Sequence, residues 1–569
     1  MSVRIIEKTP SAYAYPLLIK NLLSPSLRYA PDQEIIYRQR SRYTYQALSK
    51  RVAQVANALG NIGVAAGDTV AMMDWDSPRY LECYFAVPMI GAVLHTINIR
   101  FSPEQLAYTI NHAEDDVIIV HTDFLLLLDQ IRDQIKKDVK IVVISEDGPI
   151  PLSSLAIIGE YEALLESESG DYVFPDFNEN AAATLFYTTG TTGHPKGVSF
   201  SHRQIVLHTY GFMSGLCAYR SFAAVDSADV YMPLTPMFHV HAWGMPYLFT
   251  MLGTKQVYPG KYVPAEILRL IASERVTFSH CVPTIIHTLL NDPAIEEVDL
   301  TGWKVVIGGS ALPKGLCEAA LKRGINLFSA YGMSETCPLL TIANAKPHML
   351  TWPAAKQIEV RCTTGMAVPL VDLEIVDPDG NPLPSGTQHT GEVVARSPWL
   401  AQAYFKEPEK SEALWRDGWM HTGDVGYLDT EGYLHITDRI KDVIKSGGEW
   451  ISSLELEDII SRHEAVSEAA VIGVADEKWG ERPLVLVVLK KSLSRPVGEE
   501  ELRAHFQDYA EQGAIPRYGV PKDVLIVDAI AKTSVGKIDK KLLRQQYGQE
   551  QRARHQQRNQ FIGGFSAHD

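Results

Sequence analysis

The chain has 569 residues, 46% hydrophobic and 21% charged, which is an ordinary globular composition over more length than one compact domain usually has. Its formal net charge of −15 argues against nucleic acid as a partner, because nucleic-acid binders need basic surfaces. No apolar leader and no apolar run of about 20 residues occurs, so we expect no integral membrane segment and a cytoplasmic protein. The six cysteines lack C-x-x-C spacing and are expected to be buried thiols of a reducing compartment.

From residue 43 onward, segments with helical periodicity alternate with short apolar runs. Helices are expected over 43–62, 80–91, 105–113 and 125–135, and strands over 69–73, 92–98, 116–121 and 139–144. This alternation favours a parallel sheet with helices on both faces. A second α/β series follows, with a helix over 203–216 and strands over 182–187, 197–202, 230–234, 277–283, 304–307 and 326–330.

Near residue 371 the pattern changes to alternating polar and apolar residues. Strands over 372–377, 391–396 and 432–436, with Asp379-Gly380 and Glu431-Gly432 turns, predict a small antiparallel β subdomain. An α+β unit follows, with helices over 452–463 and 499–509 and strands over 469–474, 483–489 and 524–527. The predicted fold class is therefore α/β: a large N-terminal domain of two α/β subdomains plus the small β subdomain, then a small α+β C-terminal domain. The Gln- and Arg-rich tail after residue 548 is expected to be mobile.

One polar loop, Tyr187-Thr188-Thr189-Gly190-Thr191-Thr192-Gly193-His194-Pro195-Lys196-Gly197, lies between two expected strands. Glycines let a backbone approach an oxyanion closely, and threonine hydroxyls with a lysine supply hydrogen-bond donors. The pattern is not G-x-x-x-x-G-K-[ST], because Lys196 follows Gly193 by three residues and precedes a glycine. We interpret the segment as a phosphate-binding loop, with a flexible surface loop as the alternative.

Three further motifs carry candidate chemistry. Glu335, in Tyr331-Gly332-Met333-Ser334-Glu335-Thr336, places a carboxylate beside hydroxyls at a strand end, which suits Mg²⁺. The two histidines of Pro236-Met237-Phe238-His239-Val240-His241-Ala242-Trp243-Gly244 lack further ligands nearby in sequence, so no metal site is expected there. Gly308-Gly309-Ser310 ends a buried strand with exposed backbone that can lie against a ring or a chain.

These motifs resemble, in order and over nearly the whole chain, the acyl-adenylate-forming enzymes: acyl-CoA synthetases, luciferases and peptide-synthetase adenylation domains. The resemblance implies that ATP is a substrate and that Mg²⁺ is held by Thr188 and Glu335. The residues that it implies for ATP and AMP binding are Thr188, Thr189, Gly190, Thr191, Thr192, Gly193, Lys196, Gly309, Ser310, Ala330, Tyr331, Gly332, Met333, Ser334, Glu335, Thr336, Asp424, Ile436, Arg439 and Lys537.

The resemblance also implies roles outside the nucleotide site. Lys537, His239, Thr188 and Glu335 are the expected catalytic residues. The acid substrate is expected to contact His239, Trp243, Gly308, Gly309 and Pro338, although core packing of Trp243 is an equal alternative. Coenzyme A is expected to bind Lys445, Ser446, Gly447, Gly448 and Glu449. Asp438 matches the hinge between an N-terminal domain of residues 1–437 and a mobile C-terminal domain of residues 438–569.

The implied reaction converts a carboxylate, a poor electrophile, first to an acyl-adenylate and then to a coenzyme A thioester. The motifs look like those of bacterial medium-chain fatty acyl-CoA ligases and methylthiopropionate ligases. A medium-chain fatty acid is therefore expected, with 3-methylthiopropionate or an aryl acid as alternatives. The asparagine usual in that group before Ala242 is His241 here, which leaves the acid open.

Other functions share parts of this pattern. Luciferase-like oxidation uses the same motifs. A carrier protein is a less expected acceptor than free coenzyme A, because the chain ends soon after Lys537. A nucleotide-binding pseudoenzyme is a remote alternative, since Lys196, Glu335 and Lys537 are all present. The family resemblance further suggests a homodimer.

Overall fold

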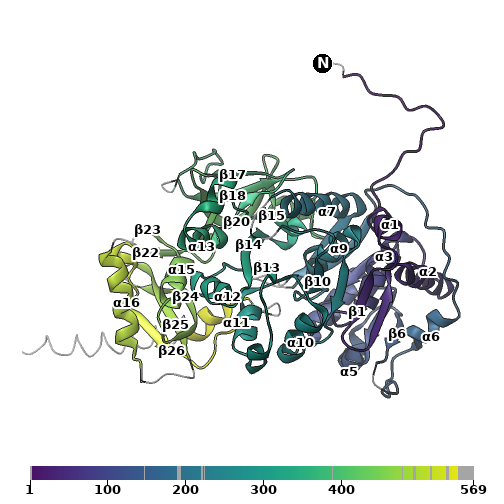
Figure 1. Ribbon diagram of the computed structural model, residues 1–569, viewed down its shortest axis with the longest axis horizontal. Coiled ribbons are helices and arrows are strands. Elements are labelled where there is room, and N and C mark those ends of the chain that lie inside the picture. Colours follow the sequence, from purple (N-terminus) through teal and green to yellow (C-terminus); the bar gives the residue numbers. More distant parts are fainter. Residues whose placement is uncertain are drawn as a thin grey trace, which may run out of the picture.

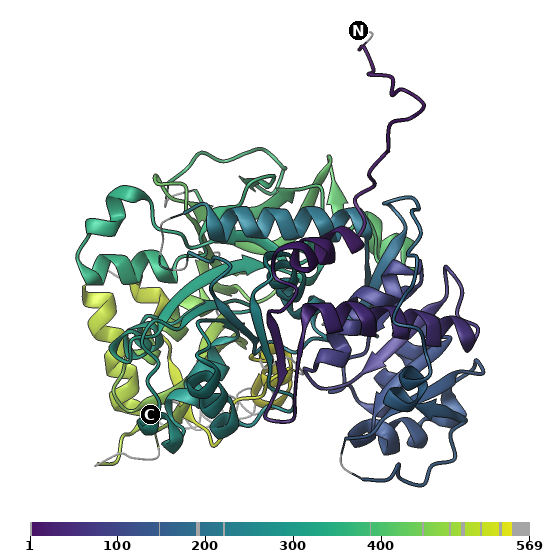
Figure 2. The same cartoon turned by 45° about the vertical axis from the view of Figure 1, so that its right-hand side comes forward.

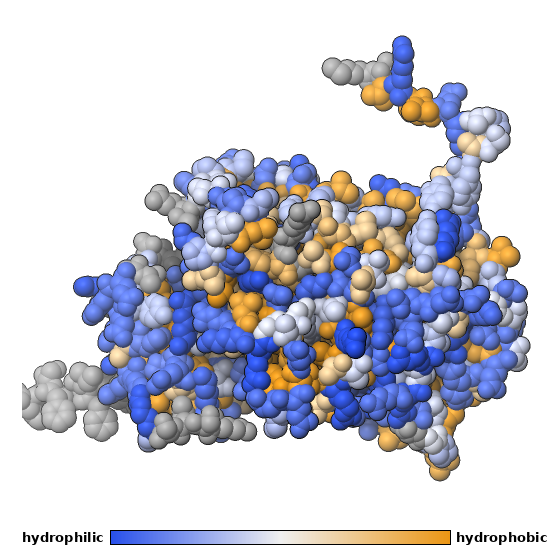
Figure 3. All heavy atoms as spheres, viewed as in Figure 1, coloured by the Kyte–Doolittle hydropathy of each residue, from blue (hydrophilic) through white to orange (hydrophobic). Residues whose placement is uncertain are grey.

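The computed structural model describes residues 3–146, 148–188, 194–219, 222, 224–386, 389–446, 449–476, 479–490, 495–512, 515–533 and 537–548. Figure 1 shows a large body with a smaller C-terminal unit, coloured yellow-green, packed at one end. An extended N-terminal arm leaves the body at the other end (Figures 1 and 2). Figure 3 shows that this arm carries hydrophobic and hydrophilic residues side by side, and Val3, Ile5 and Ile6 are among its exposed apolar residues.

The first half of the chain forms a seven-stranded sheet in the order β7-β6-β5-β3-β4-β8-β9. Its neighbours are parallel except for the last pair, β8 and β9, which is antiparallel. The strands are β3 (Thr69–Met73), β4 (Val93–Thr96), β5 (Val117–His121), β6 (Lys140–Ile144), β7 (Ile157–Glu160), β8 (Ala182–Thr188) and β9 (Lys196–Ser201). The helices of this region are α2 (Tyr45–Asn61), α3 (Pro78–Met89), α4 (Pro103–Ala113), α5 (Thr122–Gln130), α6 (Tyr161–Glu166) and α7 (His202–Cys217).

A second sheet of nine strands has the order β16-β15-β14-β13-β12-β10-β11-β1-β2. Its strands are β1 (Glu34–Tyr37), β2 (Ser41–Thr44), β10 (Val230–Pro233), β11 (Lys255–Tyr258), β12 (Phe278–Cys281), β13 (Lys304–Ile307), β14 (Asn326–Gly332), β15 (Leu339–Ile342) and β16 (Met366–Ala367). The accompanying helices are α1 (Lys20–Tyr29), α8 (Val240–Trp243), α9 (Met245–Leu252), α10 (Pro264–Glu274), α11 (Pro283–Leu290), α12 (Lys314–Lys322) and α13 (Ala354–Cys362). One apolar core runs between the two sheets, and a second lies under α10, α11 and α12.

Two smaller sheets complete the molecule. The third sheet is antiparallel and contains β17 (Asp372–Val376), β18 (Gly391–Arg396), β19 (Trp415–Arg416), β20 (Trp419–Leu428) and β21 (Leu434–Arg439), with the short helix α14 (Pro408–Glu412) nearby in sequence. The C-terminal unit contains β22 (Ile444–Ser446), β23 (Glu449–Ile451), β24 (Val466–Asp476), β25 (Gly480–Leu489) and β26 (Asp523–Ile526), with α15 (Ser453–Ser461) and α16 (Glu499–Glu511). This arrangement confirms the predicted fold class.

Several local predictions need correction. The helix expected to reach residue 135 ends at Gln130 and continues only as a 3₁₀ turn, Arg132–Gln134. The strand expected over 277–283 is shorter, because Pro283 opens helix α11. Strands β1 and β2 were not predicted, although β1 pairs in parallel with β11 more than 200 residues later in the chain. The cysteines are not all buried, since Cys217 is exposed.

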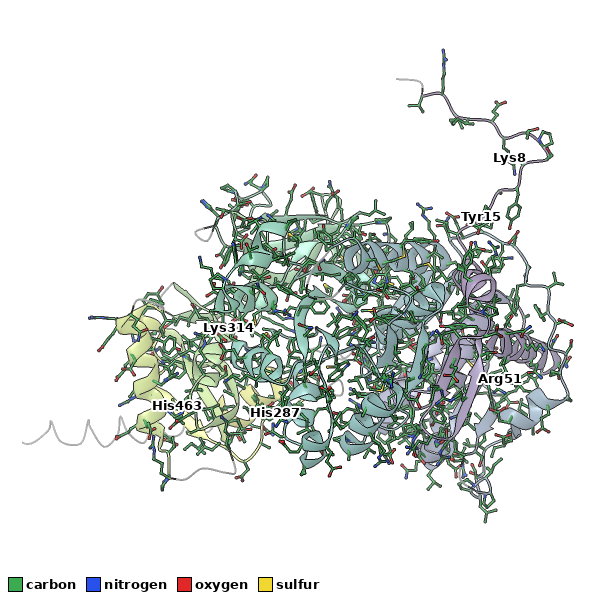
Figure 4. The ribbon with its side chains drawn as sticks, viewed as in Figure 1. Lys8, Tyr15, Arg51, His287, Lys314 and His463 are labelled. Carbon is green, nitrogen blue, oxygen red and sulfur yellow. The ribbon has the colours of Figure 1, made fainter. Side chains whose placement is uncertain are left out.

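A buried carboxylate ties together the elements around α3. The side chain of Glu82 is 1% exposed and lies 2.6 Å from the Nε atom of Arg51 on α2. It also accepts hydrogen bonds from the hydroxyls of Tyr43 (2.9 Å) and Tyr161 (2.8 Å). Arg51, labelled in Figure 4, continues to Glu162 on α6 at 2.8 Å. Because each oxygen of Glu82 has donors, its burial is compensated.

We predict that Arg51→Met lowers the free energy of unfolding by about 3 kcal/mol, because it leaves a buried carboxylate without its cation. Removing one partner of a buried ion pair costs about 3–5 kcal/mol. We expect the low end of this range because the Arg51 side chain is itself 23% exposed. Denaturant unfolding of the two proteins measures the difference. In the matched double variant Arg51→Met, Glu82→Gln, the charge is removed as well and most of the loss should be recovered. A double variant as unstable as Arg51→Met would contradict this explanation.

Candidate functional site

The candidate phosphate loop is held between two antiparallel strands. The register of β8 and β9 sets Thr188 directly opposite Lys196 at the base of the loop. The segment Thr189, Gly190, Thr191, Thr192 and Gly193 lies outside the described residues. The ammonium nitrogen of Lys196 lies 4.4 Å from the ring centroid of Tyr404, in a cation–π contact. The two strands thus bring a hydroxyl and a cation to one edge of the first sheet.

Tyr404 links this edge to the candidate metal ligand. Its hydroxyl donates to Oε1 of Glu335 at 2.7 Å, while the backbone carbonyl of Glu335 accepts from Ala401 N at 2.8 Å. Glu335 is 8% exposed, so these contacts fix its carboxylate. Burial, together with the Glu335 carboxylate, raises the pKa of Tyr404, which therefore remains a donor. No sequence pattern indicated Tyr404, because it lies about 70 residues from Glu335 and about 200 from Lys196.

A second cluster joins the second and third sheets. Asp424 on β20 and Arg439 on β21 are paired residues of one hairpin, and Nε of Arg439 lies 2.9 Å from Oδ1 of Asp424. The hydroxyl of Tyr331, on β14, donates to Oδ2 of Asp424 at 2.6 Å. Desolvation by burial and the Asp424 charge both raise the pKa of Tyr331. The structure therefore brings together three residues that the sequence proposed for the nucleotide.

Lys537 reaches this cluster from the C-terminal unit. A Cβ atom built on Gly309 would lie 2.9 Å from Lys537 Cε and 3.6 Å from its Nζ, so the lysine lies against the glycine turn after β13. Gly309 has φ +78°, a conformation that glycine adopts without strain. Burial and the nearby charge of Arg439 lower the pKa of Lys537 to about 8, against the opposing effect of Asp424 and Glu335. The lysine is thus poised at the junction of the two units.

The segment that follows His239 has an unusual backbone. Val240, His241, Ala242, Trp243 and Gly244 all have positive φ, between 46° and 72°, which makes one left-handed turn. Each non-glycine residue there costs roughly 1–2 kcal/mol, and such strain gathers at functional sites. Burial of this whole segment, at 0–6% exposure for its four side-chain-bearing members, offsets the cost.

Both histidines of this segment are neutral at physiological pH. Burial, with the charges of Lys537 and Arg100, lowers the pKa of His239 to about 3. Burial alone lowers the pKa of His241 to about 3. The ring of His241 packs edge-on against Phe186 at 5.2 Å, and its Nε2 atom has no hydrogen-bond partner among the described residues. No group of three or more His, Cys, Asp or Glu side chains suited to a metal occurs in the described part of the chain.

Gly308, one of the predicted acid-binding residues, lies beside Trp243. A Cβ on Gly308 would lie 2.9 Å from Cη2 of Trp243, so the indole packs against the backbone of the glycine turn. The indole also lies near His280, with ring centroids 5.1 Å apart. Pro338 lies against Gly332, where an added Cβ would be 1.5 Å from the Pro338 carbonyl oxygen. Trp243 is 6% exposed, so it is buried and also borders the glycine turn.

The remaining predicted residues fall into three groups. Ala330 and Gly332 lie on β14 with Tyr331. Met333 precedes the 3₁₀ turn Ser334–Thr336, which contains Glu335. Ile436 lies on β21, and Ser310 is exposed after β13. Lys445 and Ser446 lie on β22 of the C-terminal unit, and Ser446 Oγ accepts from Arg482 at 3.3 Å. Gly447 and Gly448 lie outside the described residues, and Glu449 begins β23.

Asp438 connects the third sheet to the C-terminal unit. It is 1% exposed, and its Oδ2 atom accepts from both N and Oγ of Ser453, each at 2.7 Å, at the first turn of α15. Lys540 donates to the same Ser453 hydroxyl at 2.6 Å. Burial raises the pKa of Asp438 in spite of these donors. The predicted hinge is therefore a fixed contact in this arrangement of the two units.

The donor set suits a hard divalent cation. Mg²⁺ is usually held by one or two carboxylates together with substrate phosphates rather than by a cage of protein ligands. Glu335 supplies one carboxylate, oriented by Tyr404, and Thr188 supplies a hydroxyl at the base of the phosphate loop. These residues would fit Mg²⁺ if a polyphosphate supplied the other ligands.

Comparison with protein families matches nearly the whole body of the chain. Residues 25–405 match the model described as AMP-binding enzyme. Residues 455–537 match the AMP-binding enzyme C-terminal domain. The second match ends at Lys537. It includes helix α15 from its third residue onward and the central strands of the C-terminal unit.

Several curated proteins are similar over almost their full length. The 3-methylmercaptopropionyl-CoA ligase of Ruegeria lacuscaerulensis is 38% identical, over 94% of this chain and 97% of the relative. The long-chain-fatty-acid–CoA ligase of Thermus thermophilus is 37% identical, over 89% of this chain and 90% of the relative. The medium-chain-fatty-acid–CoA ligase of Ectopseudomonas oleovorans is 36% identical, over 94% and 96%.

Solved structures share the fold. The anthranilate CoA ligase AuaEII in complex with anthranoyl-AMP superposes with a TM-score of 0.81 at 24% identity, covering 93% of this chain and 97% of that one. ATP-bound MatB from Rhodopseudomonas palustris superposes with a TM-score of 0.78 at 25% identity, covering 93% and 99%.

We predict that Asp424→Ala weakens AMP binding at least tenfold. A carboxylate that accepts hydrogen bonds contributes roughly 1.5–3 kcal/mol per bond, and a tenfold change in affinity is about 1.4 kcal/mol. Calorimetric titration with AMP measures the change. Asp429→Ala is the matched control, because Asp429 lies at the end of the same hairpin and pairs with His435 at 2.8 Å. Equal AMP affinity in Asp424→Ala and the parent protein would contradict the assignment.

Proposed function

Because the chain belongs to the AMP-binding enzyme family, we propose that it is an AMP-forming acid–CoA ligase that acts on a medium-chain fatty acid. One observation carries the proposal: Lys537 of the C-terminal unit lies against Gly309, beside the Tyr331–Asp424–Arg439 cluster and Glu335. A cation brought from one unit to the nucleotide residues of the other supports catalysis in addition to binding.

The first half-reaction joins the acid to AMP. An oxygen of the acid's carboxylate attacks the α-phosphorus of ATP, and pyrophosphate leaves. Lys196 and the loop after Thr188 would stabilise the leaving pyrophosphate, and Lys537 would stabilise the charge that grows around the α-phosphate. Asp424, already an acceptor for Tyr331 and Arg439, would accept from the ribose hydroxyls. Mg²⁺ held by Glu335 and Thr188 would neutralise charge on the β- and γ-phosphates.

The second half-reaction transfers the acyl group to coenzyme A. The thiolate attacks the acyl carbon, and AMP leaves. We propose that residues 438–569 turn about Asp438 between the two steps, so that Lys537 withdraws and Lys445 to Glu449 approach the coenzyme. The buried contact between Asp438 and Ser453 joins the proposed pivot to α15, which supports rotation of the C-terminal unit as one body.

The acid is proposed from Trp243 and from the relatives. The indole lies near both Gly308 and His280. In this position it would limit the length of an acyl chain that follows the glycine turn, which supports a medium-chain acid. The similar ligase from Ruegeria lacuscaerulensis bears a name that specifies 3-methylmercaptopropionate, so this shorter acid is the second candidate. ATP–pyrophosphate exchange and thioester formation with a panel of acids test both; no exchange with any acid would refute the proposed function.

Three further points belong to the proposal. No helix in the described part of the chain is long and apolar enough to cross a bilayer. We propose that the protein acts in the cytoplasm and forms a homodimer. The joint presence of Lys196, Glu335 and Lys537 at the site supports an enzyme over a pseudoenzyme.

We predict that Lys537→Ala slows acyl-adenylate formation by roughly 10²–10³-fold, the scale for losing one preorganised electrostatic group. Conversion of supplied acyl-adenylate to thioester should change much less, since that step does not need the lysine. Rapid-quench assays of the separate half-reactions measure both rates. Lys541→Ala, at another lysine of the same C-terminal segment, is the control and should affect neither step.

The pH dependence of adenylation provides a check on the same residue. The lysine with a pKa of about 8 is cationic below that pH. The kcat/KM for ATP should therefore fall as the pH rises through about 8, and Lys537→Arg should move this fall to higher pH. Equal slowing of both half-reactions in folded Lys537→Ala would contradict the proposed motion of the C-terminal unit.

We predict that Trp243→Ala shifts the preference for the acid, measured as a ratio of kcat/KM values, toward longer or bulkier chains. Gly308→Ala should shift the preference toward smaller acids. Its added Cβ would lie only 2.9 Å from Cη2 of Trp243, so the indole would have to move. If Trp243 only packs in the core, Trp243→Ala would instead lose about 3–5 kcal/mol of stability with unchanged selectivity. Thermal unfolding of the same samples separates the two outcomes.

A further inference from the structure

A narrow cavity of about 70 Å³ opens beside His239. It lies where the ends of β3, β10, β11 and β12 meet, at the junction of the two large sheets. Its lining includes Asp76, Arg100, Phe238, His239 and Tyr262. Carboxyl ends of parallel strands are where α/β folds bind ligands. The cavity therefore continues the site past His239, on residues that have no part in the nucleotide cluster.

Asp76 is fixed in the wall of this cavity. Its Oδ1 atom accepts from Met237 N at 2.7 Å, two residues before His239. Its backbone carbonyl accepts from Gly260 N at 2.9 Å, which joins the end of β3 to the end of β11. Gly260 has φ +67°, so a residue with a side chain would be strained at this close approach. The carboxylate is only half-buried, because one side faces the cavity.

Charged groups on several elements face Asp76. Arg100, which follows β4, has its guanidinium 5.9 Å from the ring of Phe238 and lowers the pKa of Asp76. Asp74, at the β3–α3 turn, raises it, while Asp74 itself accepts from Ser77 Oγ at 2.5 Å. Burial outweighs these effects and the Met237 N–H, and it raises the pKa of Asp76 to about 7.

In the proposed function the thiol loses a proton when the thioester forms, and a group beside His239 that accepts this proton would serve that step. The neutral imidazole of His239, with a pKa of about 3, is a weak base. Lys537 is cationic below a pH of about 8 and cannot accept a proton in that form. The hydroxyl of Tyr262 has no hydrogen-bond partner within the described residues, but a phenol is a proton donor at neutral pH. Asp74 also lines the cavity, but its carboxylate is fully buried, accepts from Trp75 N and Ser77 Oγ, and lies 3.6 Å from Arg79 Nε. Asp76 is the lining carboxylate that is held beside His239, through Met237 N.

We propose that Asp76 is the general base that deprotonates the coenzyme A thiol, an inference that rests on the proposed function. The S–H bond breaks and its proton passes to the Asp76 carboxylate. The thiolate forms a bond to the acyl carbon, and the bond from that carbon to the oxygen of AMP breaks. AMP leaves with that electron pair, and Asp76 returns its proton to water. No oxidant or further reactant is required.

The chemistry of the two partners matches. An unperturbed aspartate has a pKa of about 3.9 and a cysteine-like thiol about 8.5, so an ordinary aspartate accepts this proton poorly. A carboxylate whose pKa lies near the pH of the solution is largely deprotonated and is still basic enough to accept a proton. Arg100, which also lines the cavity, would stabilise the transient thiolate; its guanidinium lies 5.9 Å from the ring of Phe238, the residue before His239.

The test uses the full-length protein, supplied acyl-adenylate and coenzyme A. Asp76→Asn keeps an acceptor for the Met237 N–H and removes the base. It should slow acyl transfer roughly 10²-fold, and at least tenfold more than it slows pyrophosphate release. In the parent protein, the transfer rate should rise as the pH increases through about 7, because the carboxylate form is active. This rise should be absent in Asp76→Asn.

Two comparisons separate a base from a structural residue. An aryl thiol, which is already deprotonated at neutral pH, should react at similar rates with Asp76→Asn and the parent protein. Asp74→Asn removes another carboxylate of the same lining; the rise of the transfer rate with pH should persist and move to lower pH, because Asp74 raises the pKa of Asp76. The proposal would be overturned if Asp76→Asn slowed transfer to the aryl thiol by the same factor as transfer to coenzyme A. It would also be overturned if Asp76→Asn slowed both half-reactions equally.

The parent protein alone also tests the proposal, in case Asp76→Asn does not fold. A transfer rate that shows no rise with pH near 7 would overturn it. Asp76→Glu offers a second variant, in which the rise should persist at a shifted pH. Failure of the proposed function has a different signature, since the parent protein would then form no acyl-adenylate from any acid.

Discussion

The site depends on the burial of one lysine between two parts of the chain. Lys537 lies against Gly309 with Arg439, Asp424 and Glu335 as its charged neighbours. Burial, with the charges of Arg439 and Lys441, outweighs the two carboxylates and lowers the pKa of Lys537 to about 8, so the ammonium is only weakly favoured near neutral pH. A polyphosphate in this place would tip the balance toward the cation. A polyphosphate bound there would therefore favour the contact between the two units.

The two carboxylates near Lys537 are held by hydrogen bonds and ion pairs. Asp424 is held by Tyr331 and by Arg439 of its own hairpin, and Glu335 is held by Tyr404. Tyr331 lies on the second sheet and Asp424 on the third, so the packing of these two sheets sets the geometry of this part of the site. Each carboxylate is directed by a neutral or cationic donor.

The acid side of the site is built by a different device. The left-handed turn from Val240 to Gly244 is unfavourable for ordinary residues, and the surrounding core holds it. It places His239 at the cavity and Trp243 against Gly308 in only five residues. The join between β3 and β11 through Asp76 and Gly260 brings a carboxylate to the same wall. Strain and a close backbone approach thus occur together where the acyl group is proposed to react.

The sequence alone determined the alternation of strands and helices, the antiparallel third sheet and the separate C-terminal unit, because hydrophobic periodicity and turn residues act locally. It also indicated Glu335, Asp424 and Lys537, since motif order carries over from the family. Only the tertiary structure decided the contacts between distant segments. It paired β1 with β11, placed Tyr404 between Lys196 and Glu335, and set Asp76 beside Met237. These contacts depend on how two sheets pack across an apolar core, and residues so far apart in the chain leave no local signal of their meeting.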